Sequence, residues 1–292
     1  MKLGIVKEPQ IWLYGTRQCD VADELFMGWA VEIEAAIDEW YRVVTHYGYS
    51  GYVHAKSIKI VTENDLRQRM ECGLQVVICV RHVDVLTEPK VQGKILAVLC
   101  QGAFVQILPE VKNGYRRIIL ADGRQGYIPC IAYMQRMDSD AYFFAKNRKN
   151  FFYEQQVHYR DRKEEVFREQ VSRWAKSYLG TQYRWGGKSP EGLDCSGLTF
   201  MSYMLCGILI YRDAAIREEY PVKAISLNQI KKGDLLYFPG HIAMYLGQGK
   251  YIHSTGNASS FCCVINSLCE SDADFREDLA ENLYAAGSIW SA

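Results

Sequence analysis

Three residues of the chain have side chains and positions that could together perform nucleophilic chemistry: Cys195, His241 and His253. Cys195 follows Asp194 directly and stands at the start of an apolar run that reads as a helix. Because Asp194 is a favourable N-cap residue, the thiol is predicted in the first helical turn. Unpaired N–H groups and the helix dipole there stabilise negative charge, which would lower the thiol pKa toward neutrality.

A thiol nucleophile also needs a base, and two of the six histidines are placed to supply one. His241 and His253 lie on consecutive predicted strands joined by the turn "GQGK". A hairpin closed around this turn would place them nearly opposite each other, with Cβ atoms about 4.5–5.5 Å apart. His241 would then take the proton of Cys195, while His253 would fix the tautomer of His241. Two alternatives stay open: a zinc site made by these three residues, for which no fourth ligand has a recognisable spacing, and structural histidines beside an inert thiol.

The composition limits the kinds of protein that the chain can be. Its 292 residues suffice for two or three domains with cores of their own. Lys plus Arg and Asp plus Glu number 34 each, and no basic run stands out, so neither a nucleic-acid nor a membrane partner is expected. Lys7, Glu8 and Pro9 interrupt any signal-peptide core, which predicts a cytoplasmic protein. The ten scattered cysteines form no Cys-x-x-Cys, which favours free thiols.

The hydrophobic pattern predicts all-β structure first and an α+β domain last. Residues 1–66 and 67–136 read as two small barrels, in which "GYSGYV" from Gly48 is echoed by "GRQGYI" from Gly123, each after an alternating run, "WYRVVTHY" and "FVQIL". Residues 137–165 read as a linker. The last domain, 166–292, begins with a helix ended by Gly180, continues with the helix after Asp194 and then has strands. The predicted buried face of its first helix is Val166, Phe167, Gln170, Val171, Trp174, Ala175, Tyr178 and Leu179.

Two segments of this last domain, "YRWGGKSPEGLDCSGLTF" and "KKGDLLYFPGHIAMYLGQGKYIHSTG", resemble the NlpC-type murein peptidases. These are papain-like cysteine enzymes that cleave peptidoglycan peptides. The resemblance implies an α+β papain-like domain that needs no cofactor and no metal, with Cys195, His241 and His253 as its catalytic residues. It also implies that the Tyr183 hydroxyl helps the Cys195 backbone N–H to bind an oxyanion. The alternative for Tyr183 is an ordinary core aromatic.

The upstream β domains resemble bacterial SH3-like barrels, and the whole arrangement is similar to the γ-D-glutamyl-L-diamino acid peptidases, or dipeptidyl-peptidase VI group. This resemblance implies murein peptides as substrates, namely L-Ala-γ-D-Glu-L-Lys or its meso-diaminopimelate counterpart with a free N-terminus. Release of L-Ala-γ-D-Glu would serve wall-peptide recycling. A buried ammonium group requires a carboxylate partner. The implied substrate-binding residues are Asp213, Glu24 and Tyr49 (or Tyr47 or Tyr52) at the ammonium group, Ser196 at the D-Glu carboxylate, and Arg212 and Asp194 beside them.

Two other functions stay open at this point. One is a secreted or phage-type wall hydrolase anchored by its SH3-like domains, and the other is a binding protein that has lost turnover. No obligate protein partner is predicted. The C-terminal segment "DADFREDLAENLY" reads as acidic and helical near its end, without a further site.

Overall fold

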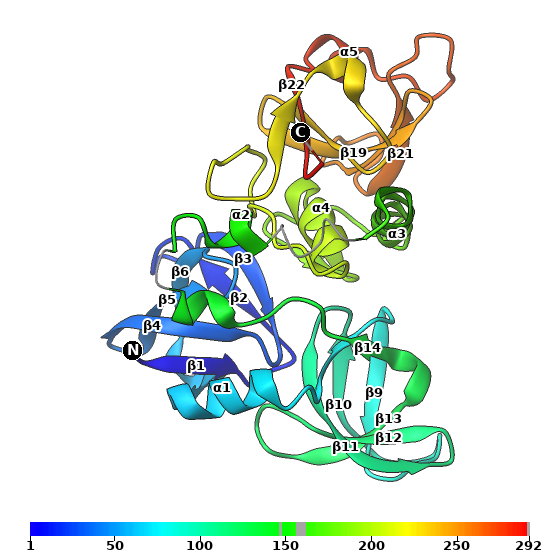
Figure 1. Ribbon diagram of the computed structural model, residues 1–292. Coiled ribbons are helices and arrows are strands. Elements are labelled where there is room, and N and C mark those ends of the chain that lie inside the picture. The colour runs from blue at the N-terminus through cyan, green and yellow to red at the C-terminus, as the bar shows by residue number, and fades with distance from the viewer. Residues whose placement is uncertain (146–147, 156–161, 291–292) are drawn as a thin grey trace. The chain divides into compact units, whose positions relative to one another are not determined.

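The computed structural model describes residues 1–145, 148–155 and 162–290 and divides into two compact units, Met1–Phe144 and Ala145–Ala292 (Figure 1). All ten cysteines carry free thiols. No helix within the described ranges is long and apolar enough to cross a membrane.

Two seven-stranded antiparallel sheets make up most of the first unit. Their strand orders are β3-β2-β6-β5-β4-β1-β7 and β10-β9-β13-β12-β11-β8-β14. Adding seven to every strand number of the first order gives the second, so the two sheets have the same topology. The predicted pair of related all-β domains is confirmed, although each sheet is an open series of strands rather than a closed barrel. The elements are β1 (Leu3–Val6), β2 (Gln10–Tyr14), β3 (Val21–Phe26), β4 (Ala30–Ile37), β5 (Trp40–Thr45), β6 (Ser50–His54), β7 (Ile58–Val61), α1 (Glu63–Glu71), β8 (Gln75–Ile78), β9 (His82–Leu86), β10 (Ile95–Cys100), β11 (Phe104–Lys112), β12 (Tyr115–Ile119), β13 (Gln125–Pro129) and β14 (Tyr133–Gln135).

The repeated motif contains a glycine in each β domain because a neighbouring strand passes too closely for a side chain. In β6, a Cβ on Gly51 would lie 2.7 Å from the backbone oxygen of Tyr14 in β2. In the equivalent strand β13, a Cβ on Gly126 would lie 2.9 Å from the backbone oxygen of Leu86 in β9. The sequence echo therefore marks equivalent positions. The runs before it are not equivalent, because "WYRVVTHY" forms β5 whereas "FVQIL" lies in β11, the counterpart of β4.

A buried polar network lies at the end of the second sheet and reaches the first. Arg136, directly after β14, donates hydrogen bonds of 2.9–3.0 Å to both Asp138 and Asp140. His46 Nε2 lies 3.3 Å from Asp138 Oδ2, and Arg69 Nε lies 3.6 Å from Asp140 Oδ2. Burial alone would raise the pKa of Asp138, but the Arg136 guanidinium and the contact with His46 together outweigh this and hold it below its usual range. The predicted linker, 137–165, thus begins with residues of this network, and its residues 146–147 and 156–161 lie outside the described part.

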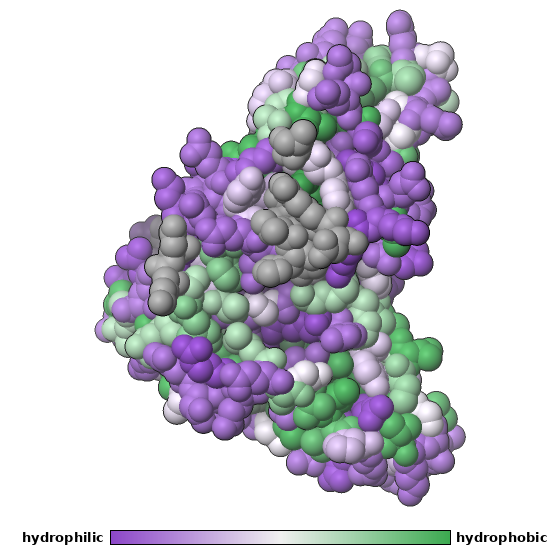
Figure 2. Space-filling model, in the orientation of Figure 1, coloured by the Kyte–Doolittle hydropathy of each residue, from purple (hydrophilic) through white to green (hydrophobic). Residues whose placement is uncertain are grey.

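The visible surface of the chain is mainly hydrophilic, with hydrophobic residues in smaller groups, as Figure 2 shows. In the second β domain the exposed large hydrophobic side chains include Val91, Ile95 and Ile131. Exposed apolar side chains of this kind are usual in folded proteins.

The second unit contains a six-stranded sheet of order β17-β22-β18-β19-β20-β21 and two principal helices (Figure 1). The helices α3 (Glu164–Lys176) and α4 (Cys195–Met204) pack against each other and against β19. Every residue of α4 is buried, so this helix has no solvent-exposed face. The predicted α+β domain is confirmed. Its other elements are α2 (Phe151–Gln155), β15 (Lys188–Ser189), β16 (Gly192–Leu193), β17 (Lys223–Ile225), β18 (Leu235–Phe238), β19 (His241–Gly247), β20 (Lys250–Ser254), β21 (Cys263–Ser267), α5 (Glu277–Glu281) and β22 (Ala285–Ser288).

The predicted buried face of the first helix of the last domain is confirmed for Phe167, Val171, Ala175 and Tyr178 and is wrong for Val166 and Leu179. Gln170 and Trp174 are half-buried. Val166 is 51% exposed, because it precedes Phe167 by one residue and so projects about 100° away from it around the helix. Leu179 is 44% exposed and lies three residues beyond the end of α3.

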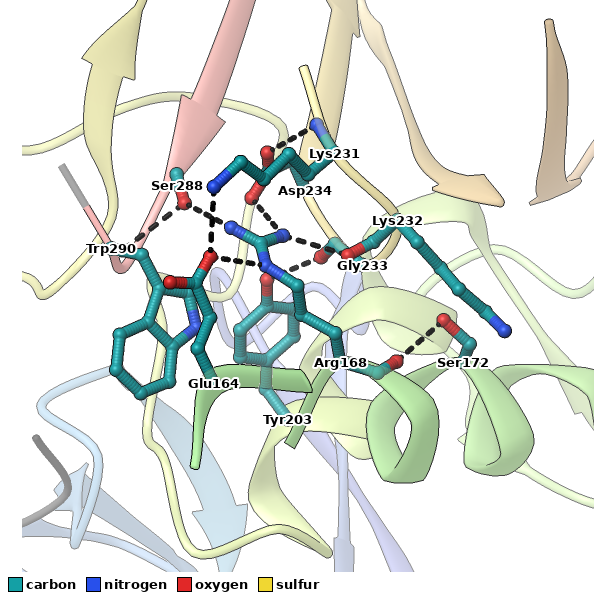
Figure 3. Close-up of polar contacts among 10 residues, drawn as sticks. All are labelled: Glu164, Arg168, Ser172, Tyr203, Lys231, Lys232, Gly233, Asp234, Ser288 and Trp290. Carbon is teal, nitrogen blue, oxygen red and sulfur yellow. Dashed lines mark hydrogen bonds and ion pairs between the residues drawn. The ribbon is translucent and has the colours of Figure 1, made fainter. Parts of the chain in front are cut away.

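One arginine ties α3 to the sheet of this unit (Figure 3). Arg168 Nη1 donates to the Asp234 carboxylate at 2.8 Å and to the Lys232 backbone oxygen at 2.7 Å, while Nε donates to Glu164 at 2.7 Å. Burial alone would lower the pKa of Arg168, but Asp234 and Glu164 outweigh this and raise it. The Arg168 and Asp234 side chains are only 10% and 2% exposed. Removing either partner would therefore leave a desolvated charge uncompensated.

The variant Asp234→Ala should lose about 3–5 kcal/mol of unfolding free energy in the second unit. Removal of the carboxylate leaves the buried charge of Arg168 without compensation. This loss is measured by urea unfolding, with hydrogen exchange of the α3 amides as the probe. The control is Glu169→Gln, which removes an exposed partner of Lys232 and should leave the unfolding midpoint almost unchanged. Equal midpoints for the two variants would contradict this account of Arg168.

Candidate active site

Asp194 caps the N-terminus of α4, as the sequence predicts, and thereby places Cys195 in the first turn. The Asp194 carboxylate accepts hydrogen bonds from the backbone N–H of Gly197 at 2.6 Å and of Gly186 at 2.9 Å. A Cβ on Gly197 would lie 2.2 Å from the Gly187 backbone oxygen, so the preceding loop packs directly on the helix start. Cys195 itself is only 8% exposed.

Arg212 is buried against this helix start, with 1% exposure. Its two terminal nitrogens each donate to one oxygen of Asp194 at 3.1 Å, a bidentate arrangement. Nη1 also donates to Ser196 Oγ at 2.7 Å, and Nη2 to the Gly186 backbone oxygen at 3.1 Å. The structure therefore brings three of the predicted substrate-binding residues, Asp194, Ser196 and Arg212, into one buried network. Asp213 follows in the chain, half-buried, and its carboxylate bonds the Tyr211 hydroxyl.

The two histidines contact each other, with His241 Nε2 2.7 Å from His253 Nδ1. The predicted hairpin would place them nearly opposite each other, but in the structure they are offset. The register pairs Met244 with Ile252, and its continuation places Ala243 opposite His253. His241 is therefore the diagonal neighbour of His253, a separation that long side chains still span. The tight turn Gln248–Gly249, with φ of 53° and 75°, closes the hairpin.

A third side chain continues the line of histidines. His253 Nε2 lies 2.9 Å from the side-chain oxygen of Asn266 in β21. Here too the contact is diagonal, because the register pairs His253 with Val264. The sequence analysis missed Asn266, since β21 was not predicted and no motif marks its strand.

The thiol and both imidazoles are neutral at neutral pH, which corrects the prediction of a thiolate-favouring helix start. Burial raises the pKa of the Cys195 thiol to about 11, and the Asp194 carboxylate adds to this effect. Backbone N–H groups of Ile242 and Ser196 donate to the sulfur and oppose the shift only in part. Burial lowers the pKa of His241 to about 3, with a contribution from His253, and that of His253 to about 4.

The sulfur of Cys195 lies at the end of β19 that carries His241. The hydrogen bond to Cys195 comes from Ile242, which directly follows His241. A neutral thiol beside a neutral imidazole is set up for general-base catalysis, in which the proton moves as the sulfur attacks.

Tyr183 lies near this helix start, in the second unit. Burial raises its pKa to about 12, and the nearby Cys195 and Asp194 add to the effect, so its hydroxyl stays protonated at neutral pH. Its backbone N–H donates to the Phe261 oxygen at 2.9 Å, and its ring meets that of Phe261 edge-on with centroids 6.0 Å apart. Tyr183 is thus a hydrogen-bond donor with a fixed backbone.

Glu24 and Tyr49, the remaining predicted binding residues, lie in the first unit. Glu24 in β3 is buried and accepts a hydrogen bond from Gln10, so it is not a solvated strand charge. Asp23 beside it is also buried and accepts from the Tyr47 hydroxyl. The Tyr47 ring stacks on Tyr49, with centroids 6.5 Å apart.

The zinc alternative does not fit the contacts of the histidines. His241 and His253 each direct one ring nitrogen at the other, so those two nitrogens are not presented together to a metal. Across the described part of the chain, no group of three or more His, Cys, Asp and Glu side chains is arranged to hold a metal ion.

Alkylation of Cys195 by iodoacetamide should be nearly independent of pH between about pH 5 and 8, because His241, with a pKa of about 3, is an unprotonated base throughout that range. In His241→Ala the rate should rise about tenfold per pH unit, since only the thiolate fraction then reacts. Mass spectrometry of the Cys195 peptide gives both profiles. A wild-type rate with the same steep slope would show that the thiol ionises without the imidazole.

Comparison with known proteins agrees with this geometry. Residues 180–271, which include Cys195, His241 and His253, match the NlpC/P60 family. Dipeptidyl-peptidase 6 of Lysinibacillus sphaericus is 35% identical over 296 residues, which cover 99% of this chain and 97% of that protein. A gamma-D-glutamyl-L-lysine dipeptidyl-peptidase of Bacillus cereus is 40% identical over 87 residues, 27% of this chain and 26% of that protein. The crystal structure of an NlpC/P60 family protein from Bacillus cereus shares the fold, with a TM-score of 0.73, 18% identity and coverage of 97% of this chain and 98% of that one. The chain therefore belongs to the NlpC/P60 family of cysteine peptidases.

Proposed function

We propose that this peptidase hydrolyses the γ-D-glutamyl-L-diamino acid bond of murein stem peptides that carry a free N-terminal L-Ala, and so releases L-Ala-γ-D-Glu. The observation that carries the proposal is the 35% identity to a dipeptidyl-peptidase 6 along 99% of the chain. That similarity includes both β domains and is not confined to the peptidase domain. The diamino acid is L-Lys or meso-diaminopimelate.

In the proposed reaction Cys195 is the nucleophile and His241 the base. The thiol proton passes to Nδ1 of His241, whose Nε2 is engaged by His253, while the sulfur attacks the γ-carbonyl carbon of D-Glu. The imidazolium then gives this proton to the departing amine of the diamino acid, which leaves a thioester. A water molecule, deprotonated by the same imidazole, hydrolyses the thioester and restores the thiol.

The negative oxygen that forms in both steps would be held by two donors. One is the backbone N–H of Cys195, at the N-terminus of α4, where such groups lack helical partners. The other is the Tyr183 hydroxyl, which remains protonated because burial raises its pKa to about 12. Donors fixed in advance cost no reorganisation when the charge develops.

Carboxylates would select the peptide by its ammonium group. We assign this role to Asp213, because a desolvated ammonium group needs an anionic partner. For Glu24 and Tyr49, which belong to the first unit, the same role stays a prediction from the resemblance. The Ser196 hydroxyl donates to Asp194 at 3.3 Å and accepts from Arg212 at 2.7 Å. On substrate binding it would turn its hydrogen from Asp194 to the α-carboxylate of D-Glu. A peptide whose amine is blocked, or attached to glycan, has no ammonium charge to offer the Asp213 carboxylate and would bind more weakly.

The proposal places the enzyme in the recycling of wall peptides in the cytoplasm. A free L-Ala amine arises only after an amidase has separated the stem peptide from its glycan. A requirement for a free N-terminal amine would therefore restrict the enzyme to peptides already released from the wall, as recycling demands.

Mass spectrometry should show L-Ala-γ-D-Glu released from the two unblocked tripeptides. Cleavage of their N-acetylated forms should be slower by about 10- to 100-fold, because they lose a charge-assisted hydrogen bond worth about 1.5–3 kcal/mol. Cys195→Ser is the control and should remove turnover, since a serine hydroxyl is much less acidic than the thiol. Equal cleavage of blocked and unblocked peptides would instead favour a wall hydrolase. Intact peptides after long incubation with reduced protein would indicate a binding protein.

The variant Tyr183→Phe should lower kcat by about 10²–10³-fold with little change in KM, the usual effect of removing one oxyanion donor. Steady-state kinetics on the unblocked L-Lys tripeptide test this. The alkylation rate of Cys195 is an internal control, because alkylation forms no oxyanion and should not change. A kcat within threefold of wild type would remove Tyr183 from the proposed mechanism.

A further inference from the structure

Asn266 is the end of a line of polar side chains that runs diagonally across three strands, β19, β20 and β21. His241 Nε2 contacts His253 Nδ1 at 2.7 Å, and His253 Nε2 contacts Asn266 Oδ1 at 2.9 Å. On its other side, Asn266 Nδ2 donates to the backbone oxygen of Asp274 at 2.9 Å. The line therefore ends on a backbone carbonyl, a group that can only accept.

This carbonyl determines every proton position along the line. Since Asp274 O accepts, the amide of Asn266 must turn its Nδ2 toward it and its oxygen toward His253. That oxygen can only accept, so His253 Nε2 carries a hydrogen. In a neutral imidazole the other nitrogen is then an acceptor, so His253 Nδ1 receives a hydrogen from His241 Nε2. The remaining nitrogen of His241, Nδ1, is left without a hydrogen and is the basic one.

Burial makes this arrangement persist. His253 is fully buried, and both histidines have pKa values lowered by burial, so each ring carries one hydrogen at neutral pH. With one hydrogen per ring, only two consistent arrangements exist, and the two place the basic nitrogen of His241 on opposite sides of the ring. Asn266 selects between them.

The loop that presents Asp274 is held by several contacts of its own. The Asp274 oxygen also accepts from the Ser267 backbone N–H at 3.0 Å. Lys250 in β20 pairs with the Asp274 carboxylate at 2.6 Å and with Asp272 at 2.8 Å. Ser267 Oγ donates to Asp272 at 2.6 Å. The acidic segment in which the sequence analysis found no site therefore fixes the position of the carbonyl.

We propose that Asn266 is a positioning residue that, held by the Asp274 carbonyl, imposes the tautomer of His253 and thereby makes Nδ1 the basic nitrogen of His241. It contacts neither the thiol nor the reacting atoms and acts only through His253. The role in turnover rests on the proposed function, but the tautomers themselves do not.

Nitrogen-15 NMR of histidine-labelled wild-type protein tests the proposal without any substrate. We expect both His241 and His253 to carry their hydrogen on Nε2 at neutral pH. Assignment uses the loss of one signal set in His241→Ala and of the other in His253→Ala. A hydrogen on Nδ1 of either ring in the wild type would overturn the proposal, whichever peptides the enzyme cleaves.

Variants of Asn266 supply the kinetic test, on the unblocked L-Lys tripeptide and by Cys195 alkylation. Asn266→Leu removes the acceptor at similar size and should lower kcat by between about tenfold and 10⁴-fold, the larger figure being the cost of a wrong tautomer in a comparable triad. Asn266→Asp keeps an acceptor toward His253 in either protonation state and should keep kcat within about tenfold. The matched control is Asn282→Leu, because Asn282 also donates to a backbone oxygen, that of Asp278, but contacts no histidine.

The outcomes separate this proposal from the function above. Reduced kcat and alkylation in Asn266→Leu, with altered histidine tautomers and an unchanged Asn282→Leu variant, would support it. Unchanged kcat or alkylation in a folded Asn266→Leu variant would overturn it. If Asn266→Leu does not fold, the proposal is decided by the wild-type tautomers and by Asn266→Asp, in which an Nδ1-protonated His253 would overturn it. If the wild type cleaves no tripeptide, the proposed function fails, while NMR and alkylation still decide the role of Asn266.

Discussion

The chemistry of the second unit depends on one hydrogen bond, that between His241 Nε2 and His253 Nδ1. Because Asn266 requires a hydrogen on His253 Nε2, His253 can accept from His241 only if its Nδ1 carries no hydrogen, and it must therefore stay neutral. Burial ensures this, because it lowers the pKa of His253 to about 4. The antiparallel sheet supplies the geometry, since adjacent strands in one register hold both rings on the same face and two residues out of step.

A buried ion pair performs the corresponding role at the thiol. Asp194 caps α4 and bonds Arg212 through both oxygens, which fixes the first helical turn against the preceding glycine loop. The same carboxylate raises the thiol pKa, whereas Arg212 lowers it, so the pair positions the sulfur without ionising it. Buried pairs are weak sources of stability and are better explained by the single arrangement that they specify. The nucleophile of the site is therefore held in position but uncharged, so its reactivity depends on a base that is oriented to take its proton.

The first unit shows how far a repeat can diverge while its topology remains. Its two sheets have the same strand order, yet the sequence echo between them is short and includes the glycines that allow a close strand approach. Elsewhere each β domain needs only alternating apolar residues, which many sequences satisfy. Buried acidic side chains occur in both: Asp23 and Glu24 in the first, and Asp138 and Asp140 after the second. The latter two are paired with Arg136, and Asp140 also with Arg69, which makes them part of the fold.

Features that depend on local chemistry could be predicted from the order of the residues. Residues close together in the chain predict the order of all-β and α+β regions, the Asp194 cap, the hairpin of His241 and His253 and the resemblance around Cys195.

The remaining features depend on contacts between distant parts of the chain. The thiol pKa depends on burial by distant segments, and the buried face of α3 depends on where the helix ends. The diagonal pairing of the histidines depends on a register that a turn alone does not fix. Asn266 and Asp274 could not be found at all, because each is an ordinary polar residue until β21 and the loop after it fold beside β20. A hydrogen bond acts over about 3 Å of space, whereas sequence patterns report neighbours along the chain.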